Sequence, residues 1–122
     1  MLAGARPAFL NQTATNGFGL GLDRLNRSDW ERVQLMYVCS PGNPSGRVLT
    51  LDDWRAVFEL SDRYGFAVAS DECYSEIYFR DEPPLGGLEA AAKLGRSDFR
   101  RLISFTSPVS YTHLTLPTIL RV

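Results

Sequence analysis

The chain has 122 residues, of which 44% are hydrophobic, and its 13 Lys and Arg against 14 Asp and Glu give a formal net charge of −1. This length suits one small domain or part of a larger one, and the near-neutral charge argues against a nucleic-acid or anionic-membrane partner attracted by bulk charge. No apolar run approaches the roughly 18 residues of a membrane-spanning helix, and the first residues lack the pattern of a signal peptide.

The cysteines and the single histidine limit the chemistry further. Cys39 and Cys73 have no CxxC spacing, so we expect reduced thiols in a cytoplasmic protein, acting as small apolar fillers. His113 is the only histidine, so no histidine-based metal site or triad is expected upstream of it.

The first third of the chain contains two predicted strands separated by a glycine-rich loop. Residues 7–14 favour a short strand, and residues 16–25 form a loop that leads to a short polar helix. That loop lacks the GxGxxG spacing of a phosphate loop. Residues 33–41 are a continuous apolar run ended by Pro and Gly, which is typical of a strand buried on both faces of a parallel sheet.

Residues 50–65 carry the clearest helix pattern in the sequence. Thr50 can cap the amino end, Asp53 completes a capping box, and Gly65 is a typical stop signal. One face of this helix is expected to enter the core, with Trp54 and Phe58 at its centre, and comprises Leu51, Trp54, Val57, Phe58, Ser61 and Tyr64.

Three further elements follow in alternation. Residues 66–72 predict a second buried strand, residues 88–95 a short helix, and residues 101–107 a third strand. Strands that alternate with helices indicate crossover units, so we predict an α/β fold with a mostly parallel sheet.

Polar side chains follow each predicted strand. Asn43 follows the first strand, Asp71 and Tyr74 the second, and Thr106 and Ser107 the third. In open α/β sheets, ligands bind just outside the carboxyl ends of the strands. An amide, a carboxylate, a phenol and hydroxyls suit a polar, flat, phosphorylated cofactor, and they include no metal-ligand cluster.

Two short motifs give this site a resemblance to a known family. "NPSG" at residues 43–46, followed by "SDECY" at residues 70–74, resembles the large domain of the class I/II, fold-type I pyridoxal-phosphate aminotransferases. The longer stretches "CSPGNPSGRVLTLDDW" and "LSDRYGFAVASDECYSEIYF" are similar to the succinyldiaminopimelate aminotransferases of lysine biosynthesis. The resemblance covers residues 1–107 and identifies them as a fragment of the pyridoxal-phosphate-binding large domain.

The resemblance implies a cytoplasmic, homodimeric enzyme that moves an amino group between glutamate and N-succinyl-2-amino-6-oxopimelate. Its partners would be small amino acids and 2-oxo acids, with no nucleic acid and no membrane. The substrate-binding arginines would lie outside residues 1–107, so another class I/II aminotransferase, of the aspartate, aromatic or alanine type, stays open. A non-catalytic α/β binding module is a further alternative.

The resemblance also implies roles for four residues. Asp71 would face the pyridine nitrogen of the cofactor, Asn43 and Tyr74 would donate to its phenolate oxygen, and Ser107 would bind its phosphate. Each has a plainer alternative: Asp71 as a turn cap, Tyr74 as a half-buried aromatic, Asn43 as a turn residue, and Ser107 as a strand-end serine. We expect no metal ligand among them.

The segment after Ser107 departs from the family pattern. The lysine that forms the Schiff base is expected three residues after the phosphate-binding serine, and Ser110 stands there. "VSYTHLTLPT" at residues 109–118 is also one reading frame of the transposon mosaic-end adapter used in sequencing libraries. We therefore expect residues 108–122 to be a foreign tail and the chain as given to be inactive; a natural Thr/Leu-rich strand is the alternative.

An independent sequence of the same locus tests the adapter interpretation. Unfragmented genomic DNA should continue after the Ser107 codon with a lysine-bearing run resembling Leu-Ser-Lys, because the family places its lysine there. Recovering the present residues 108–122 from such DNA would show that the tail is native.

Overall fold

The computed structural model describes residues 4–106, which fall into two compact units, Met1–Arg32 and Val33–Val122. The first unit contains two 3₁₀ helices, η1 (Ala14–Asn16) and η2 (Leu22–Arg24), and one short helix, α1 (Arg27–Trp30). The side chain of Asn26 caps α1 by accepting the Asp29 N–H at 3.0 Å, so the predicted polar helix is confirmed.

The strand predicted at residues 7–14 is wrong. Residues 7–13 have no regular structure, and Thr13 is instead the amino-terminal cap of η1. The Thr13 N–H donates to the Asn16 side-chain oxygen at 2.9 Å. Such local side-chain bonds offer the backbone an alternative to strand pairing, which explains why the apolar residues before Thr13 do not form a strand.

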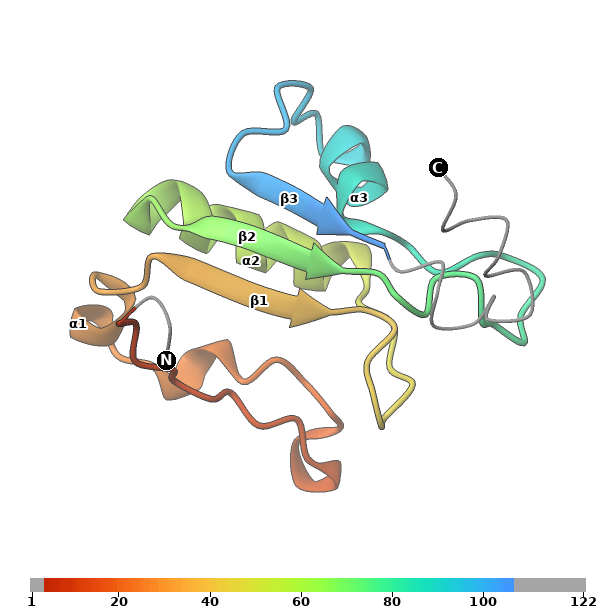
Figure 1. Cartoon of the computed structure of the whole chain (residues 1–122), viewed down its shortest axis with the longest axis horizontal. Coiled ribbons are helices and arrows are strands. Elements are labelled where there is room, and N and C mark those ends of the chain that lie inside the picture. Colours follow the sequence, from red (N-terminus) through yellow and green to blue (C-terminus); the bar gives the residue numbers. More distant parts are fainter. Residues whose placement is uncertain (1–3, 107–122) are drawn as a thin grey trace. The chain divides into compact units, whose positions relative to one another are not determined.

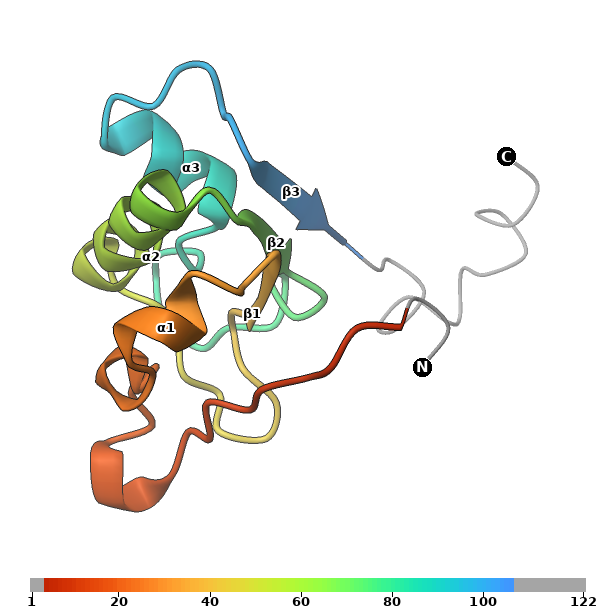
Figure 2. The same ribbon diagram turned by 90° about the vertical axis from the view of Figure 1, so that its left-hand side faces the viewer.

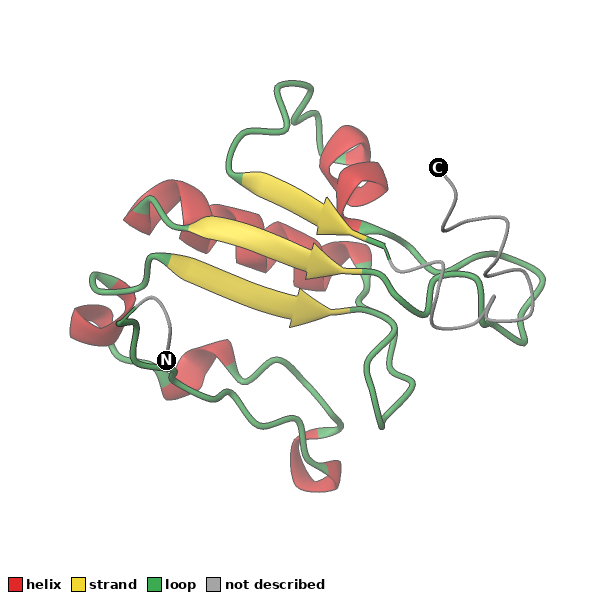
Figure 3. Cartoon of the chain, in the orientation of Figure 1, coloured by secondary structure: helices red, strands yellow, loops and turns green. Residues whose placement is uncertain are grey.

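The second unit is built on a three-stranded parallel sheet in the order β1 (Leu35–Cys39), β2 (Ala67–Asp71) and β3 (Leu102–Phe105) (Figure 1). Helix α2 (Leu51–Tyr64) connects β1 to β2, and α3 (Gly87–Lys93) connects β2 to β3 (Figure 3). The predicted α/β fold with crossover helices is therefore confirmed.

Helix α2 begins and ends as its sequence predicts. Thr50 Oγ1 accepts the Asp53 N–H at 3.2 Å, and the Asp53 carboxylate accepts the Thr50 N–H at 2.9 Å. Gly65 adopts a left-handed φ of 81° and donates its N–H to the Ser61 carbonyl. The inward face buries four of the six predicted residues, namely Trp54, Val57, Phe58 and Ser61.

Both crossover helices lie on one face of the sheet (Figure 2). Helix α2 packs against β2, α3 against β3, and the two helices against each other. Right-handed crossovers that step in the same direction across a sheet put their helices on the same side. Gly87 permits this packing, because a Cβ there would lie 3.1 Å from both the Trp54 ring and the Ser70 side chain.

An ion-pair cluster fastens α2 to the segment before β3. Asp62 accepts hydrogen bonds from Arg96 and from Arg101, the latter at 2.7 Å, and the Arg96 guanidinium lies 4.9 Å from the centre of the Phe58 ring. The bond from Arg96 is the main cause of the lowered pKa of Asp62. The cluster therefore stabilises the fold at neutral pH, and its contribution is lost as the pH falls through the pKa of Asp62.

The other face of the sheet carries exposed apolar side chains. Leu35 and Tyr37 of β1 are 56% and 62% exposed, and Ile103 and Phe105 of β3 are 48% and 49% exposed. The prediction that β1 is buried on both faces is wrong, since Val38 is its only buried residue. Among the described residues of the second unit, none forms a helix on this face of the sheet. Between residues 4 and 106, no helix is long and apolar enough to cross a membrane.

We predict that the 122-residue chain, expressed alone, is insoluble or molten, because parallel sheets are stable when both faces are covered. Changing Leu35 and Ile103 together to Lys should raise its solubility, whereas Leu88→Lys, at a similarly exposed position on α3, should not. The soluble fraction and light scattering compare the variants with the unchanged chain, and calorimetry tests for a cooperative unfolding transition. A monomer with a cooperative, reversible unfolding transition would contradict the prediction.

Candidate active site

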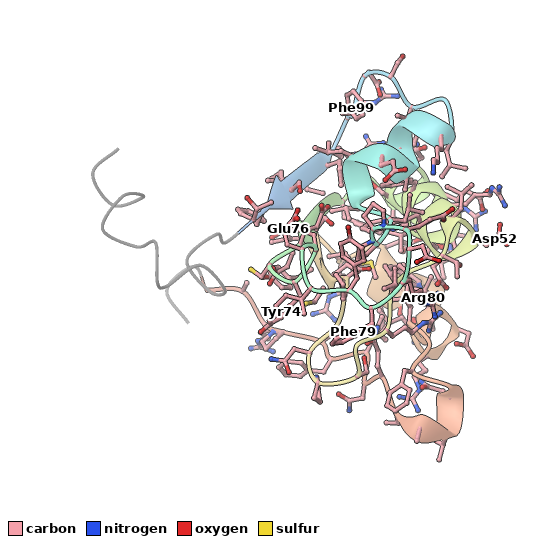
Figure 4. All side chains as sticks on the ribbon, turned by 90° about the vertical axis from the view of Figure 1, so that its right-hand side faces the viewer. Asp52, Tyr74, Glu76, Phe79, Arg80 and Phe99 are labelled. Carbon is pink, nitrogen blue, oxygen red and sulfur yellow. The ribbon has the colours of Figure 1, made fainter. Side chains whose placement is uncertain are left out.

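The described polar residues predicted at the strand ends lie at the carboxyl edge of the sheet. Figure 4 views the molecule from this edge and shows Tyr74 on the connection between β2 and α3. The parallel register pairs Cys39 with Asp71 and Asp71 with Phe105, so the segments that leave the three strands start side by side. Thr106 is exposed at the end of β3, whereas Ser107 and Ser110 lie outside the described residues.

Asn43 lies on a closed loop between β1 and α2. The Gly42 N–H donates to the Arg47 carbonyl at 2.9 Å, and the Gly46 N–H donates to the Gly42 carbonyl at 2.7 Å. Gly46 has a φ of 67°, a left-handed conformation that glycine adopts without strain. The "NPSG" sequence thus forms a tight turn that presents Asn43 at the edge of the sheet.

The base of this loop is fixed by two side-chain interactions. Buried Ser40 accepts the Leu49 N–H on its hydroxyl at 3.0 Å and so joins the two arms of the loop. Arg47 pairs with Asp53 at 2.8 Å, with both side chains largely buried, and this bond connects the loop to the first turn of α2. The loop therefore holds a defined position relative to the sheet.

Asn43 and Tyr74 are in direct contact. The Asn43 amide donates to the Tyr74 hydroxyl oxygen at 3.2 Å, across 31 positions of sequence. An amide nitrogen carries two N–H groups, and a phenol oxygen that accepts a bond keeps its own proton. The pair therefore retains one N–H and one O–H donor that can converge on a single anionic oxygen.

Asp71, the last residue of β2, has a partner on each carboxylate oxygen. One oxygen accepts the Cys73 N–H at 3.1 Å, and the other accepts the Tyr37 hydroxyl. Burial raises the pKa of Asp71, but hydrogen bonds from Cys73 and Tyr37 outweigh it and leave the pKa below its ordinary value. Asp71 therefore caps a turn, which was the alternative to a cofactor role. It is also an ionised hydrogen-bond acceptor at neutral pH.

Tyr37 is a residue of this site that the sequence did not reveal. It was predicted as part of a strand buried on both faces, yet its side chain is exposed and its hydroxyl reaches Asp71. The hydrogen bond to Asp71 is the main cause that raises the pKa of Tyr37 to about 12. Strand alternation could have revealed this residue. Tyr37 and Cys39 are two positions apart and lie on the same face of the sheet, and Asp71, which pairs with Cys39, lies on that face as well.

Glu72, which had no expected role, fixes the connection that carries Tyr74. Its carboxylate accepts the Ser70 hydroxyl at 2.7 Å and the Gly87 N–H at 2.9 Å. A Cβ at Gly86 would lie 2.6 Å from the other carboxylate oxygen, so this approach depends on glycine. Glu72 therefore joins the end of β2 to the start of α3.

The two cysteines show no sign of nucleophilic activation. Burial is the main cause that raises the pKa of Cys39, and a hydrogen bond with Asp71 is the main cause for Cys73. Both are free thiols, and a protonated thiol is a poor nucleophile. Within residues 4–106, no three His, Cys, Asp or Glu side chains gather where they could hold a metal ion.

The donor set fits pyridoxal phosphate. The Asn43–Tyr74 pair could donate to its phenolate oxygen, and the ionised Asp71 could accept from its protonated ring nitrogen. These groups follow or end two adjacent strands at the carboxyl edge of the sheet, which is where ligands bind in such folds.

Comparison with known proteins agrees with this arrangement. The model of the family "Aminotransferase class I and II" matches residues 2–105. An aminotransferase structure from Neisseria meningitidis Z2491 superposes with a TM-score of 0.82 and 51% identity, covering 88% of this chain and 27% of that one. N-Succinyldiaminopimelate aminotransferase from Mycobacterium tuberculosis superposes with a TM-score of 0.53 and 26% identity, covering 65% of this chain and 19% of that one.

A curated relative gives a similar result. LL-diaminopimelate aminotransferase from Desulforudis audaxviator (strain MP104C) is 34% identical over 91 residues, or 75% of this chain and 23% of the relative. The first curated relatives are matched over 20% to 23% of their own length, so the chain spans about a fifth of such proteins.

Proposed function

Because the chain belongs to the aminotransferase class I and II family, we propose that it forms part of a pyridoxal-phosphate-dependent transaminase. Its reaction would move an amino group between glutamate and N-succinyl-2-amino-6-oxopimelate. The observation that carries the proposal is that the Asn43–Tyr74 donor pair and the ionised Asp71 both lie at the carboxyl edge of a parallel sheet. A simple α/β binding module has no need of this donor set.

Asp71 has the central chemical role in this proposal. Bound pyridoxal phosphate supplies an electron sink for the negative charge that develops on the substrate carbon. The Asp71 carboxylate, ionised at neutral pH, would accept the ring N–H and keep that nitrogen protonated, which would make the sink effective. Since this interaction strengthens as negative charge develops, it acts chiefly on the rate.

Asn43 and Tyr74 orient the cofactor. Their two remaining donors would bind its phenolate oxygen, and the loop fixed by Ser40 would hold Asn43 in place for that bond. Ser107 is proposed to bind the phosphate, on the basis of the family motif alone. We also propose that the whole enzyme is a cytoplasmic homodimer, as the resemblance implies.

The chain as given is proposed to be inactive. The family pattern expects a lysine at position 110, and the sequence has Ser110. A hydroxyl cannot form the Schiff base that the amine forms. Activity is therefore expected only of the full-length enzyme, with the lysine-bearing continuation after Ser107.

Two similar proteins whose names state a substrate support the proposed substrate. The relative from Desulforudis audaxviator is named for LL-diaminopimelate, and the structure from Mycobacterium tuberculosis for N-succinyldiaminopimelate. Both names denote diaminopimelate or its N-succinyl derivative, which supports a substrate built on that carbon skeleton. A class I/II aminotransferase for aspartate, aromatic or alanine-type substrates is the alternative.

Purified full-length enzyme should transfer the amino group of glutamate to N-succinyl-2-amino-6-oxopimelate with a higher kcat/KM than to oxaloacetate or pyruvate. Coupled assays with LL-diaminopimelate as donor test the unsuccinylated compound in parallel. A preference for oxaloacetate, aromatic 2-oxo acids or pyruvate would reject the proposed substrate but leave the transaminase proposal intact.

Asp71→Asn in the full-length enzyme should weaken cofactor binding by roughly 1.5–3 kcal/mol, the worth of a hydrogen bond to a charged group. The kcat should fall much further, because the charge acts mostly in the transition state. Cofactor titration and steady-state kinetics separate the two effects. Asp52→Asn, on the exposed first turn of α2, is the matched control; near-normal turnover of Asp71→Asn would defeat the assignment.

A further inference from the structure

Tyr37 hydrogen-bonds to Asp71 from the neighbouring strand. It belongs to β1, and its hydroxyl donates to the Asp71 oxygen that does not cap the turn. The strand register pairs Tyr37 with Ala69 and Cys39 with Asp71, so Tyr37 reaches along its own strand toward the carboxyl edge. The backbone N–H of Cys73 holds the other oxygen at 3.1 Å.

We propose that Tyr37 is a positioning residue that acts through Asp71, because its hydrogen bond from the neighbouring strand fixes the orientation of the carboxylate. The proposal rests on the proposed function, in which Asp71 faces the ring nitrogen of pyridoxal phosphate. Its consequence is that the shared proton stays on the ring nitrogen and not on Asp71.

The direction follows from hydrogen bonding. A phenol that donates to a carboxylate stabilises the ionised form, so the Tyr37 bond lowers the pKa of Asp71. The same bond raises the pKa of Tyr37 to about 12, so the hydroxyl remains a donor over the working pH range. Without this donor, the carboxylate becomes more basic and attracts the proton away from the ring nitrogen.

Among residues 4–106, Tyr37 is the only tyrosine whose hydroxyl hydrogen-bonds to the Asp71 carboxylate. The other titratable groups that influence Tyr37 there are Cys39 and Cys73, whose thiols both have raised pKa values. They stay neutral near pH 7, so they do not replace the charge or the bond that Tyr37 supplies. A plainer role is that Tyr37 only covers the face of the sheet.

The test uses full-length holoenzyme with pyridoxal phosphate labelled with ¹⁵N at the ring nitrogen. In Tyr37→Phe, which keeps the ring and removes the hydroxyl, the ¹⁵N resonance should move toward the value of unprotonated pyridine. The kcat should fall about tenfold, the lower end expected for one hydrogen bond to a charged group, with KM for glutamate within about twofold. Tyr78→Phe, at an exposed position beyond Tyr74, is the control and should change neither quantity.

A double-mutant cycle separates positioning from packing. If Tyr37 acts through Asp71, Tyr37→Phe should change kcat less than about twofold in the Asp71→Asn background. An equal loss in both backgrounds, or a lower Tm with an unchanged ¹⁵N resonance, would overturn the inference and leave the proposed function standing. Failure of the wild-type enzyme to bind pyridoxal phosphate would overturn both.

Discussion

The parallel pairing of β1 with β2 is the constraint on which the rest of the site depends. The register that pairs Cys39 with Asp71 makes the two strands end together, and the Ser40 N–H continues the ladder to the Asp71 carbonyl. From that point, one chain segment turns through the loop that carries Asn43, and the other turns toward Tyr74. A shift of one residue would move Asp71 to the face covered by α2, and its hydrogen bond from Tyr37 would be lost.

The elements defined by local chemistry were predictable from the sequence. The capping box of Thr50 and Asp53 and the left-handed Gly65 mark both ends of α2, because each depends on residues within one turn. Burial of β1 was not predictable in this way, whereas β2 was predicted as a buried strand and its three central residues are buried. An apolar run indicates a strand, but which faces are covered depends on where the crossover helices pack, and both pack on one side. The strand expected at residues 7–14 failed because Thr13 and Asn16 bond locally.

The same division applies to the site. The motifs predicted that Asn43 and Tyr74 share a site, and the fold brings them into a direct hydrogen bond. They did not predict the bond from Tyr37 to Asp71 or the bond from Gly87 to Glu72, because those contacts join residues brought together by register and helix position. Tyr37 reaches Asp71 across 34 positions of sequence, and Glu72 reaches Gly87 across 15. The sequence therefore indicates the chemistry of each site residue. The long-range hydrogen-bond partners of Asp71 and Glu72 are known only from the tertiary structure.

A crystal structure of the full-length enzyme with pyridoxal phosphate tests the central claim most directly. The account predicts that the ring nitrogen lies about 2.7–3.2 Å from an Asp71 carboxylate oxygen, the range of a hydrogen bond. It also predicts that the phenolate oxygen contacts both the Asn43 amide and the Tyr74 hydroxyl. A cofactor bound elsewhere, or one whose ring nitrogen faces a residue other than Asp71, would contradict it.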